Sequence, residues 1–273
     1  MSDLMRIFSN VQAMQSQQAL MRINDQLGLH QYRLATGKKI NSAEDDSAGY
    51  ALSRGLEARR RGLEIALGNV SNAKNIMNVA EGGYQNIMDI LATLKEKATQ
   101  ASDDSLNDSQ RTAIGNQITE LIKEIDDIVD ETKFNGFALI DGTYSKTFQT
   151  GEGTADTLDV ALNDADSAAL GIDSISVASH ASASAAMTSI DSAINTLSTA
   201  IQEVGDIKNR LSSKETALSV SITNTEASRS LIEDADFAKE QMEVMKLQIL
   251  QQTAVSSLTQ ANTAPNVVLS LFR

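Results

Sequence analysis

The stretch ALGNVSNAKNIMNVAEGGYQNIMDILATLKEKA, residues 66–98, decides the fold. Apolar residues recur in it at alternating spacings of four and three, namely Ala66, Val70, Ala73, Met77, Ala80, Tyr84, Ile87, Leu91, Leu94 and Ala98. An a/d pattern kept over roughly four heptads predicts a helix about 50 Å long that packs against other helices in coiled-coil fashion. Gly82 and Gly83 interrupt the pattern and predict a kink or a close crossing.

Two more segments carry the same spacing. The first contains Ile114, Ile118, Leu121, Ile125 and Ile128, and ends before the turn signal at residues 134–136. The second begins at about Ile190 and continues through Ile194, Leu197, Ile201, Val204, Ile207, Leu211, Leu218 and Ile222. Between them, residues 137–180 are rich in Gly, Ser, Thr and Asp, and alternate at Leu158, Val160 and Leu162 and at Ile175 and Val177. We therefore predict a mainly α fold, an elongated bundle of long coiled-coil-like helices with a small β-hairpin region.

The composition agrees with helices packed through small and unbranched side chains. The chain has 273 residues with no Cys, no Trp, one Pro and 4% aromatic residues. A formal net charge of −13 argues against nucleic acid or an anionic membrane as the main partner. There is no apolar run of transmembrane length and no signal-peptide pattern, so the residues alone predict a cytoplasmic protein.

The two ends differ from the middle. The N-terminal segment has one apolar stripe, Leu20, Ile23, Leu27 and Leu34, in which His30 takes a seam position where we expect it to pack. The C-terminal segment has two offset stripes, one of Met242, Met245 and Ile249 and one of Leu247, Leu250, Ala254, Leu258 and Ala261. A helix with two apolar faces cannot bury both inside one slender monomer, so the sequence predicts contact with neighbouring copies.

Motifs for catalysis or metal binding are weak. His30 and His180 lie far apart, and we expect no metal, no cofactor and no catalytic residue. The run Glu44-Asp45-Asp46 has a cation site as an alternative interpretation, but we favour Ser42 capping a helix start with Asp45 returning the reciprocal hydrogen bond. Gly37 fits a helix C-cap better than a phosphate loop.

Three stretches carry a family resemblance. RLATGKKINSAEDDSAG, residues 33–49, closely resembles the bacterial flagellin consensus RLSSGxxINSAxDDAAG, and TKFNG, residues 132–136, is a second match. The third is the C-terminal signature, formed by LIEDADFA at 231–238, QILQQ at 248–252, QAN at 260–262 and LSLFR at 269–273. The matching motif residues are Arg33, Gly37, Asn41, Ser42, Asp45, Asp46, Gly49, Phe134, Asn135, Gly136, Asp234, Asp236 and Asn262.

This resemblance implies a non-enzymatic structural subunit that assembles with itself into the helical filament of the bacterial flagellum for motility. It implies that residues 1–40 and 235–273 pair as an inner filament-core domain. Residues 41–234 would form an outer helical bundle with the β-rich excursion, in a short form that lacks hypervariable outer domains. Flagellins are exported unfolded through the flagellar type III channel, so the resemblance replaces the cytoplasmic prediction with a secreted, extracellular protein.

The resemblance also implies partners. These are the export chaperone and export apparatus, the hook-associated proteins and the cap proteins. We expect polymerisation to depend on Leu20, Ile23, Leu27, Leu34, Met245, Ile249, Leu250, Leu258, Leu269, Leu271, Phe272 and Arg273.

Some flagellins are recognised by an innate immune Toll-like receptor through a surface that resembles Q-R-x-R-E-L-A. The matching stretch here is ATLKEKA, residues 92–98. Thr93 replaces the first arginine, Lys95 keeps the charge of the second without its planar fork, Glu96 is retained, and Lys97 replaces the leucine. We therefore expect weak recognition.

Two alternatives stay open at this point. A hook–filament junction protein shares the terminal helical plan, although the Asn-Ser-Ala-x-Asp-Asp and Leu-Ser-Leu-Phe-Arg matches are those of flagellin. Some flagellins carry a metalloprotease insert, but this chain has no such insert and no zinc motif.

Overall fold

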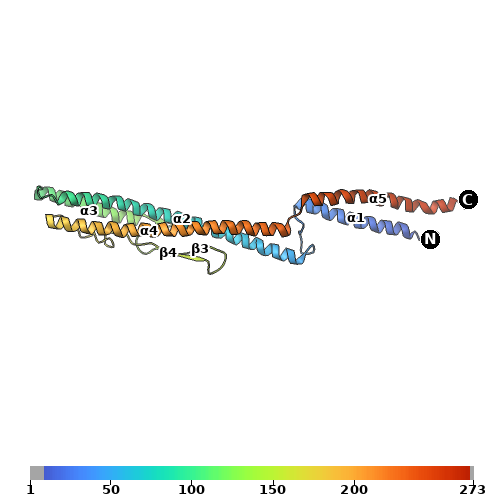
Figure 1. The fold of residues 1–273 in the computed structure, drawn as a ribbon, viewed down its shortest axis with the longest axis horizontal. Coiled ribbons are helices and arrows are strands. Elements are labelled where there is room, and N and C mark those ends of the chain that lie inside the picture. Colours follow the sequence, from blue (N-terminus) through green and yellow to red (C-terminus); the bar gives the residue numbers. More distant parts are fainter. Residues whose placement is uncertain (1–8, 271–273) are drawn as a thin grey trace. The chain divides into compact units, whose positions relative to one another are not determined.

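The computed structural model describes the backbone of residues 9–270 and the side chains as far as Thr263. In that range the chain forms five helices, α1 Val11–Thr36, α2 Ser47–Ala101, α3 Asp108–Glu131, α4 His180–Glu233 and α5 Phe237–Ser270 (Figure 1). Its short strands are β1 Lys133–Phe134, β2 Phe137–Ala138, β3 Ser145–Gln149 and β4 Thr157–Ala161. The predicted mainly α fold with a small β region is confirmed. None of the helices, as far as they are described, is long and apolar enough to cross a membrane.

The chain divides into two compact units. The terminal unit takes the described residues of Met1–Ala58 and Asn224–Arg273, and the central unit is Arg59–Thr223. Helices α2 and α4 therefore contribute residues to both units. The domain boundaries expected from the sequence, after residues 40 and 234, fall in the connections between helices, whereas the compact units divide within α2 and α4.

The core of the central unit is the predicted seam of α2. All ten seam residues from Ala66 to Ala98 are at most 2% exposed. They pack with the buried residues Ile114, Ile118 and Ile125 of α3 and with Ile190, Leu197, Val204 and Leu211 of α4. Within this unit the three helices lie side by side (Figure 1). Ion pairs between Lys74 and Glu215 (2.6 Å) and between Lys208 and Glu81 (2.5 Å) join α2 to α4.

Gly83 marks the close crossing that the sequence left open. A Cβ atom built there would lie 2.8 Å from Thr132 Oγ1 and 3.0 Å from Ile140 Cδ1, whereas one at Gly82 would meet nothing within 4 Å. Only Gly83 is therefore required by packing, and α2 continues through both residues.

The β region follows the expected turn signal. β1 and β2 pair antiparallel around Asn135 and Gly136, whose φ angles of 51° and 83° are those of a tight hairpin turn. β3 pairs antiparallel with β4, and Leu158 and Val160 alternate into the core as predicted.

A second strand pattern, at Ile175 and Val177, was misleading. The structure has no strand there, although Val177 is buried. Its side chain lies against Gly115 of α3, where a Cβ atom would come within 3.4 Å of it. The alternation therefore predicted the burial of Val177 correctly but not a strand, because no neighbouring strand among the described residues pairs with this backbone.

Candidate assembly surface on the terminal helices

The terminal unit is built around a seam between α1 and α5, which lie side by side (Figure 1). The α1 residues of the predicted stripe, Leu20, Ile23, Leu27 and Leu34, are half-buried. On α5, Val244, Leu247 and Ala261 are buried and Leu258 is half-buried. Spacings of three and four on both helices are those of coiled-coil packing. The stripe predicted on α1 is therefore occupied by α5 of the same chain.

Three polar contacts follow this seam. Asn10 Nδ2 donates to the Ala261 carbonyl at 2.8 Å, and Gln251 Nε2 donates to Asn24 Oδ1 at 2.7 Å. His30 Nδ1 lies 2.5 Å from Glu240 Oε2. His30 thus takes the seam position expected of it and also pairs with a nearly buried carboxylate.

The outer face of α5 stays uncovered. Met242, Met245 and Ile249 are all at least half exposed, with Ile249 at 65%. At about 100° per residue they lie on the side of α5 opposite the seam. Leu250, predicted in the second stripe, is also exposed, because Gln251 takes the seam position between Leu247 and Ala254.

Helix α1 has an outer apolar face that sequence reasoning missed. Met14, Met21, Leu29 and Tyr32 are exposed on the side away from α5, and no residue of α1 is buried. These four residues are separated by Gln, Arg and Asp, so they form no continuous apolar pattern. Their signal in the sequence was the seven-residue spacing of the two methionines.

A short ladder of backbone hydrogen bonds joins the α1–α2 connection to the α4–α5 connection. Helix α1 ends at Gly37, which has a φ of 71° and donates its N–H to the Arg33 carbonyl, as predicted for a C-cap. The Ala235 N–H donates to the Gly37 carbonyl at 2.9 Å, and the Lys39 N–H donates to the Glu233 carbonyl at 2.8 Å. Backbone hydrogen bonds between residues 37–39 and 233–235 therefore hold the start of α5 against the end of α1.

Glu233 is the centre of the charges at this ladder. Its side chain is 4% exposed and accepts hydrogen bonds from Lys38 Nζ at 2.5 Å and Arg229 Nη1 at 2.7 Å. Burial acts to raise the pKa of the Glu233 carboxyl, but the hydrogen bonds and charges of Lys38 and Arg229 outweigh it and hold the pKa below its ordinary value. The carboxylate therefore stays ionised and links both connections.

In the acidic run at residues 44–46, Asp45 and Asp46 accept hydrogen bonds from backbone N–H groups. Asp45 Oδ2 accepts the N–H groups of Asn41 and Ser42, both at 3.0 Å, and these bonds hold the pKa of the Asp45 carboxyl below its ordinary value. The predicted hydrogen bond from the Ser42 N–H to Asp45 is confirmed, but the prediction that Ser42 caps a helix is wrong. Helix α2 starts at Ser47, and Asp46 Oδ1 caps it by accepting the N–H groups of Ala48 and Gly49.

The same arrangement explains other motif residues. Gly49 is required because a Cβ atom there would lie 2.5 Å from Asp46 Oδ2 and 2.8 Å from Ile40 Cδ1. Arg33 Nη2 lies 3.7 Å from Asp45 Oδ1. Asp236 Oδ1 caps α5 by accepting the N–H groups of Ala238 and Lys239. Within the described residues, no cluster of three or more His, Asp or Glu could hold a metal ion.

Several predicted residues lie elsewhere. Asp234 bridges to Lys38 through the backbone, and Asn262 is exposed on α5. Phe134, Asn135 and Gly136 belong to the β1–β2 hairpin of the central unit. Leu269 falls in α5 beyond the described side chains, and Leu271, Phe272 and Arg273 lie outside the described residues.

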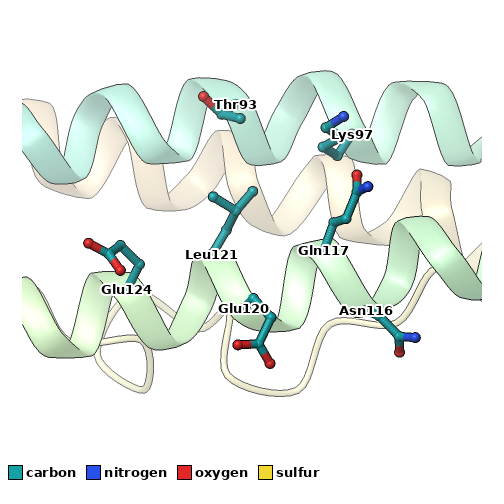
Figure 2. Close-up of a pocket in the computed structure, with 7 residues that line it drawn as sticks. All are labelled: Thr93, Lys97, Asn116, Gln117, Glu120, Leu121 and Glu124. Atoms are coloured by element: carbon teal, nitrogen blue, oxygen red, sulfur yellow. The ribbon is translucent and has the colours of Figure 1, made fainter.

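The receptor-type stretch lies on α2 in the central unit. Thr93 and Lys97 line a groove of about 700 Å³ together with α3 residues Asn116, Gln117, Glu120, Leu121 and Glu124. Figure 2 shows Leu121 and Gln117 pointing toward α2, with Asn116 and Glu120 pointing away from it. Lys95 pairs with Asp191 of α4 at 2.5 Å, and Glu96 is exposed.

Comparisons with known proteins match most of the chain. Residues 7–145 match the model of the bacterial flagellin N-terminal helical region, and residues 187–272 match that of the bacterial flagellin C-terminal helical region. A flagellin of Treponema pallidum is 30% identical over 98% of this chain and 100% of its own length. A flagellin of Listeria innocua is 31% identical over 98% of this chain and 99% of its own.

One solved structure adds a likeness of fold. A putative flagellar hook-associated protein from Vibrio parahaemolyticus covers 69% of this chain and 99% of its own, with a TM-score of 0.59 and 16% identity. At that identity the match concerns the arrangement of the helices alone.

Proposed function

The chain belongs to the bacterial flagellin family and is a structural subunit of the flagellar filament rather than an enzyme, and we propose that its copies join through the outer faces of α1 and α5. The observation that carries this proposal is the pair of uncovered apolar faces. The other sides of α1 and α5 already pack against each other. The exposed apolar residues are Met242, Met245 and Ile249 on α5 and Met14 and Met21 on α1.

The physical drive is burial of these faces. A large apolar side chain that becomes fully buried contributes about 1.5–3 kcal/mol, so several such residues on each subunit stabilise a contact between copies. Identical head-to-tail contacts propagate a helical tube when the rotation per subunit does not close a ring. We assign residues 1–40 and 235–273 to the inner, filament-core domain and residues 41–234 to the outer one.

The seam residues act in a different way from the outer ones. Leu20, Ile23, Leu27, Leu34 and Leu258 hold α1 and α5 together, and so position the outer faces. Met245, Ile249 and Leu250 contact the neighbouring copy directly. We expect Leu269, Leu271, Phe272 and Arg273, whose side chains lie outside the described residues, to be required for polymerisation as well.

We extend the proposal to the route by which the chain reaches the filament. The chain leaves the cell unfolded through the flagellar type III channel and is extracellular once assembled. An export chaperone covers the α5 face before export, and the hook-associated and cap proteins contact the growing filament. Membership of the flagellin family supports this route. In a strain whose flagellar export gate is deleted, the chain should remain inside the cell.

Recognition by the Toll-like receptor should be weak. Lys95, one of the two cations of the receptor-type stretch, is committed to Asp191, and Thr93 and Lys97 occupy positions where the receptor-type pattern has Arg and Leu. A reporter cell line should respond to purified chain far less than to an enteric flagellin. An equal response would contradict this part of the proposal.

The assembly proposal is tested with a matched pair of variants. M245S/I249S changes the outer face of α5, and I65S/V220S changes two exposed apolar residues of the central unit. Losing the burial of two apolar side chains should raise the critical concentration for filament formation about a hundredfold in the first variant. The second variant should assemble like the natural chain.

Sedimentation of filaments, with circular dichroism of the subunits as the folding control, measures the difference. Normal assembly of M245S/I249S would contradict the proposal. Counting copies per flagellum distinguishes a filament subunit from a junction protein, because a junction protein forms only a short ring.

A further inference from the structure

The methionines of this chain are unevenly distributed. Met14 and Met21 on α1 and Met242 and Met245 on α5 are each at least 50% exposed, and we call them the outer methionines. In the central unit, Met77 is fully buried and Met88 and Met187 are half-buried. Among the described methionines, the exposed ones therefore all lie on the terminal helices, on the sides turned away from the α1–α5 seam.

Their spacing places each pair on one helical face. Met14 and Met21 are two turns apart, about 10 Å along α1, and Met242 and Met245 are one turn apart on α5. The thioether is at most a weak hydrogen-bond acceptor, so solvent exposure leaves these four sulfurs accessible to an oxidant. The chain also has no cysteine that would react with an oxidant before they do.

A thioether in this setting has a defined chemistry. Its sulfur attacks one oxygen of a peroxide, the O–O bond breaks, and the departing oxygen takes the proton and leaves as water when the oxidant is hydrogen peroxide. The sulfur loses two electrons and becomes a sulfoxide, while the peroxide is reduced. The product is polar and chiral, and thiol-dependent methionine sulfoxide reductases reverse the step.

We propose that the outer methionines are a redox-sensitive modification site, at which oxidation by peroxide blocks addition of the subunit to the filament. This inference rests on the proposed function, since it needs the outer faces to be buried between copies. A sulfoxide oxygen buried in an apolar contact without a donor opposes association. Free subunits are the sensitive state, and filaments protect the same sulfurs from the oxidant.

The experiment uses the full chain. Purified subunits are treated with hydrogen peroxide, freed of it, and added to filament seeds, and the critical concentration is measured by sedimentation. We expect it to rise at least about tenfold, the effect of one unsatisfied buried polar group on an association constant. Treatment with methionine sulfoxide reductases and a thiol should restore assembly. Peptide mass spectrometry should locate the added oxygens on the outer methionines.

Leucine variants identify the responsible sulfurs. Leucine has similar volume and no oxidisable sulfur, so the critical concentration of M14L/M21L/M242L/M245L should be the same before and after peroxide treatment. The control M88L/M187L should remain sensitive. Should the fourfold variant assemble poorly without peroxide, M14L/M21L and M242L/M245L are tested separately, and each should remove part of the sensitivity.

The outcomes separate this inference from the proposed function. If the oxidised natural chain assembles normally, or if the leucine variants stay fully sensitive, the redox inference is wrong while the assembly surface stands. If M245S/I249S assembles normally without any oxidant, the proposed function fails instead. Protection of the outer methionines in preformed filaments, with oxidation at least about tenfold slower than in subunits, is required by both.

Discussion

The central and terminal units use the same apolar spacing and bury it to different degrees. In the central unit, α2 places ten seam residues at 2% exposure or less, because α3, α4 and the hairpins cover it. In the terminal unit, α1 has no buried residue and packs along α5. The central unit therefore supplies a buried core within one chain, whereas the terminal unit keeps exposed apolar faces that association can bury.

The largest effect should come from shortening a core leucine of the central unit. L91A removes a fully buried side chain and should lower the free energy of unfolding by about 2–5 kcal/mol. L29A makes the same chemical change on the exposed face of α1 and should stay within about 0.5 kcal/mol. Urea unfolding of unassembled subunits measures both. Similar losses in the two variants would remove the contrast between the units.

The next effect concerns the buried charge of the terminal unit. E233Q keeps the shape of the side chain but loses the ion pairs with Lys38 and Arg229, and should destabilise this unit by about 1–3 kcal/mol. Hydrogen exchange of the Lys39 N–H, which donates to the Glu233 carbonyl, reports the local opening. D234N, an exposed neighbour, should exchange like the natural chain.

The contribution of Glu233 has a defined pH dependence. Its pKa is lowered in the folded chain, so the stabilisation is complete above its ordinary value of 4.5 and is lost as the pH falls through the folded pKa. The difference between the natural chain and E233Q should therefore shrink in acid below about pH 4.5. A difference that persists unchanged to low pH would assign the effect to something other than the charge of this carboxylate.

A neighbouring pair of glycines tests how tightly the central unit is packed. G83A pushes a methyl group against Thr132 and Ile140 and should cost about 1–3 kcal/mol. G82A has open space and should gain up to about 1 kcal/mol from helix propensity. Thermal unfolding of the two variants should therefore shift in opposite directions. A shift in the same direction would show that the crossing is looser than described.

The smallest effect should come from an exposed ion pair. Lys95 and Asp191 are each about half exposed, and such pairs contribute little. K95M should change the free energy of unfolding by less than about 0.5 kcal/mol. If K95M lowered the free energy of unfolding as much as E233Q does, the buried Glu233 would contribute no more than the exposed Lys95–Asp191 pair, against this account.

The sequence predicted most where one pattern was repeated often. The α2 seam was found residue by residue, because ten consecutive positions agreed with one helical period. The turn at Asn135-Gly136 and the cap at Gly37 were also found, since few other residues adopt a positive φ. Local chemistry was less certain, and the cap of α2 lay at Asp46 rather than Ser42 because both are good capping residues a few positions apart.

The candidate site was predicted only in part. The apolar spacing in the C-terminal helix predicted two apolar faces. It did not predict which face the N-terminal helix covers, or that Leu250 stays exposed. The outer face of α1 was missed because its four apolar residues are separated by polar ones. Glu233 meets Lys38 across 195 residues of chain, and such a tertiary contact leaves no local pattern, whereas Arg229 lies one helical turn before Glu233 on α4.

Electron cryomicroscopy of filaments assembled from the full chain tests the central claim most directly. The account predicts that the side chains of Met242, Met245 and Ile249 on α5 are buried against a neighbouring subunit, while the α1–α5 seam of each subunit remains as described here. A filament in which these three side chains face solvent, and in which copies associate only through the central unit, would contradict it.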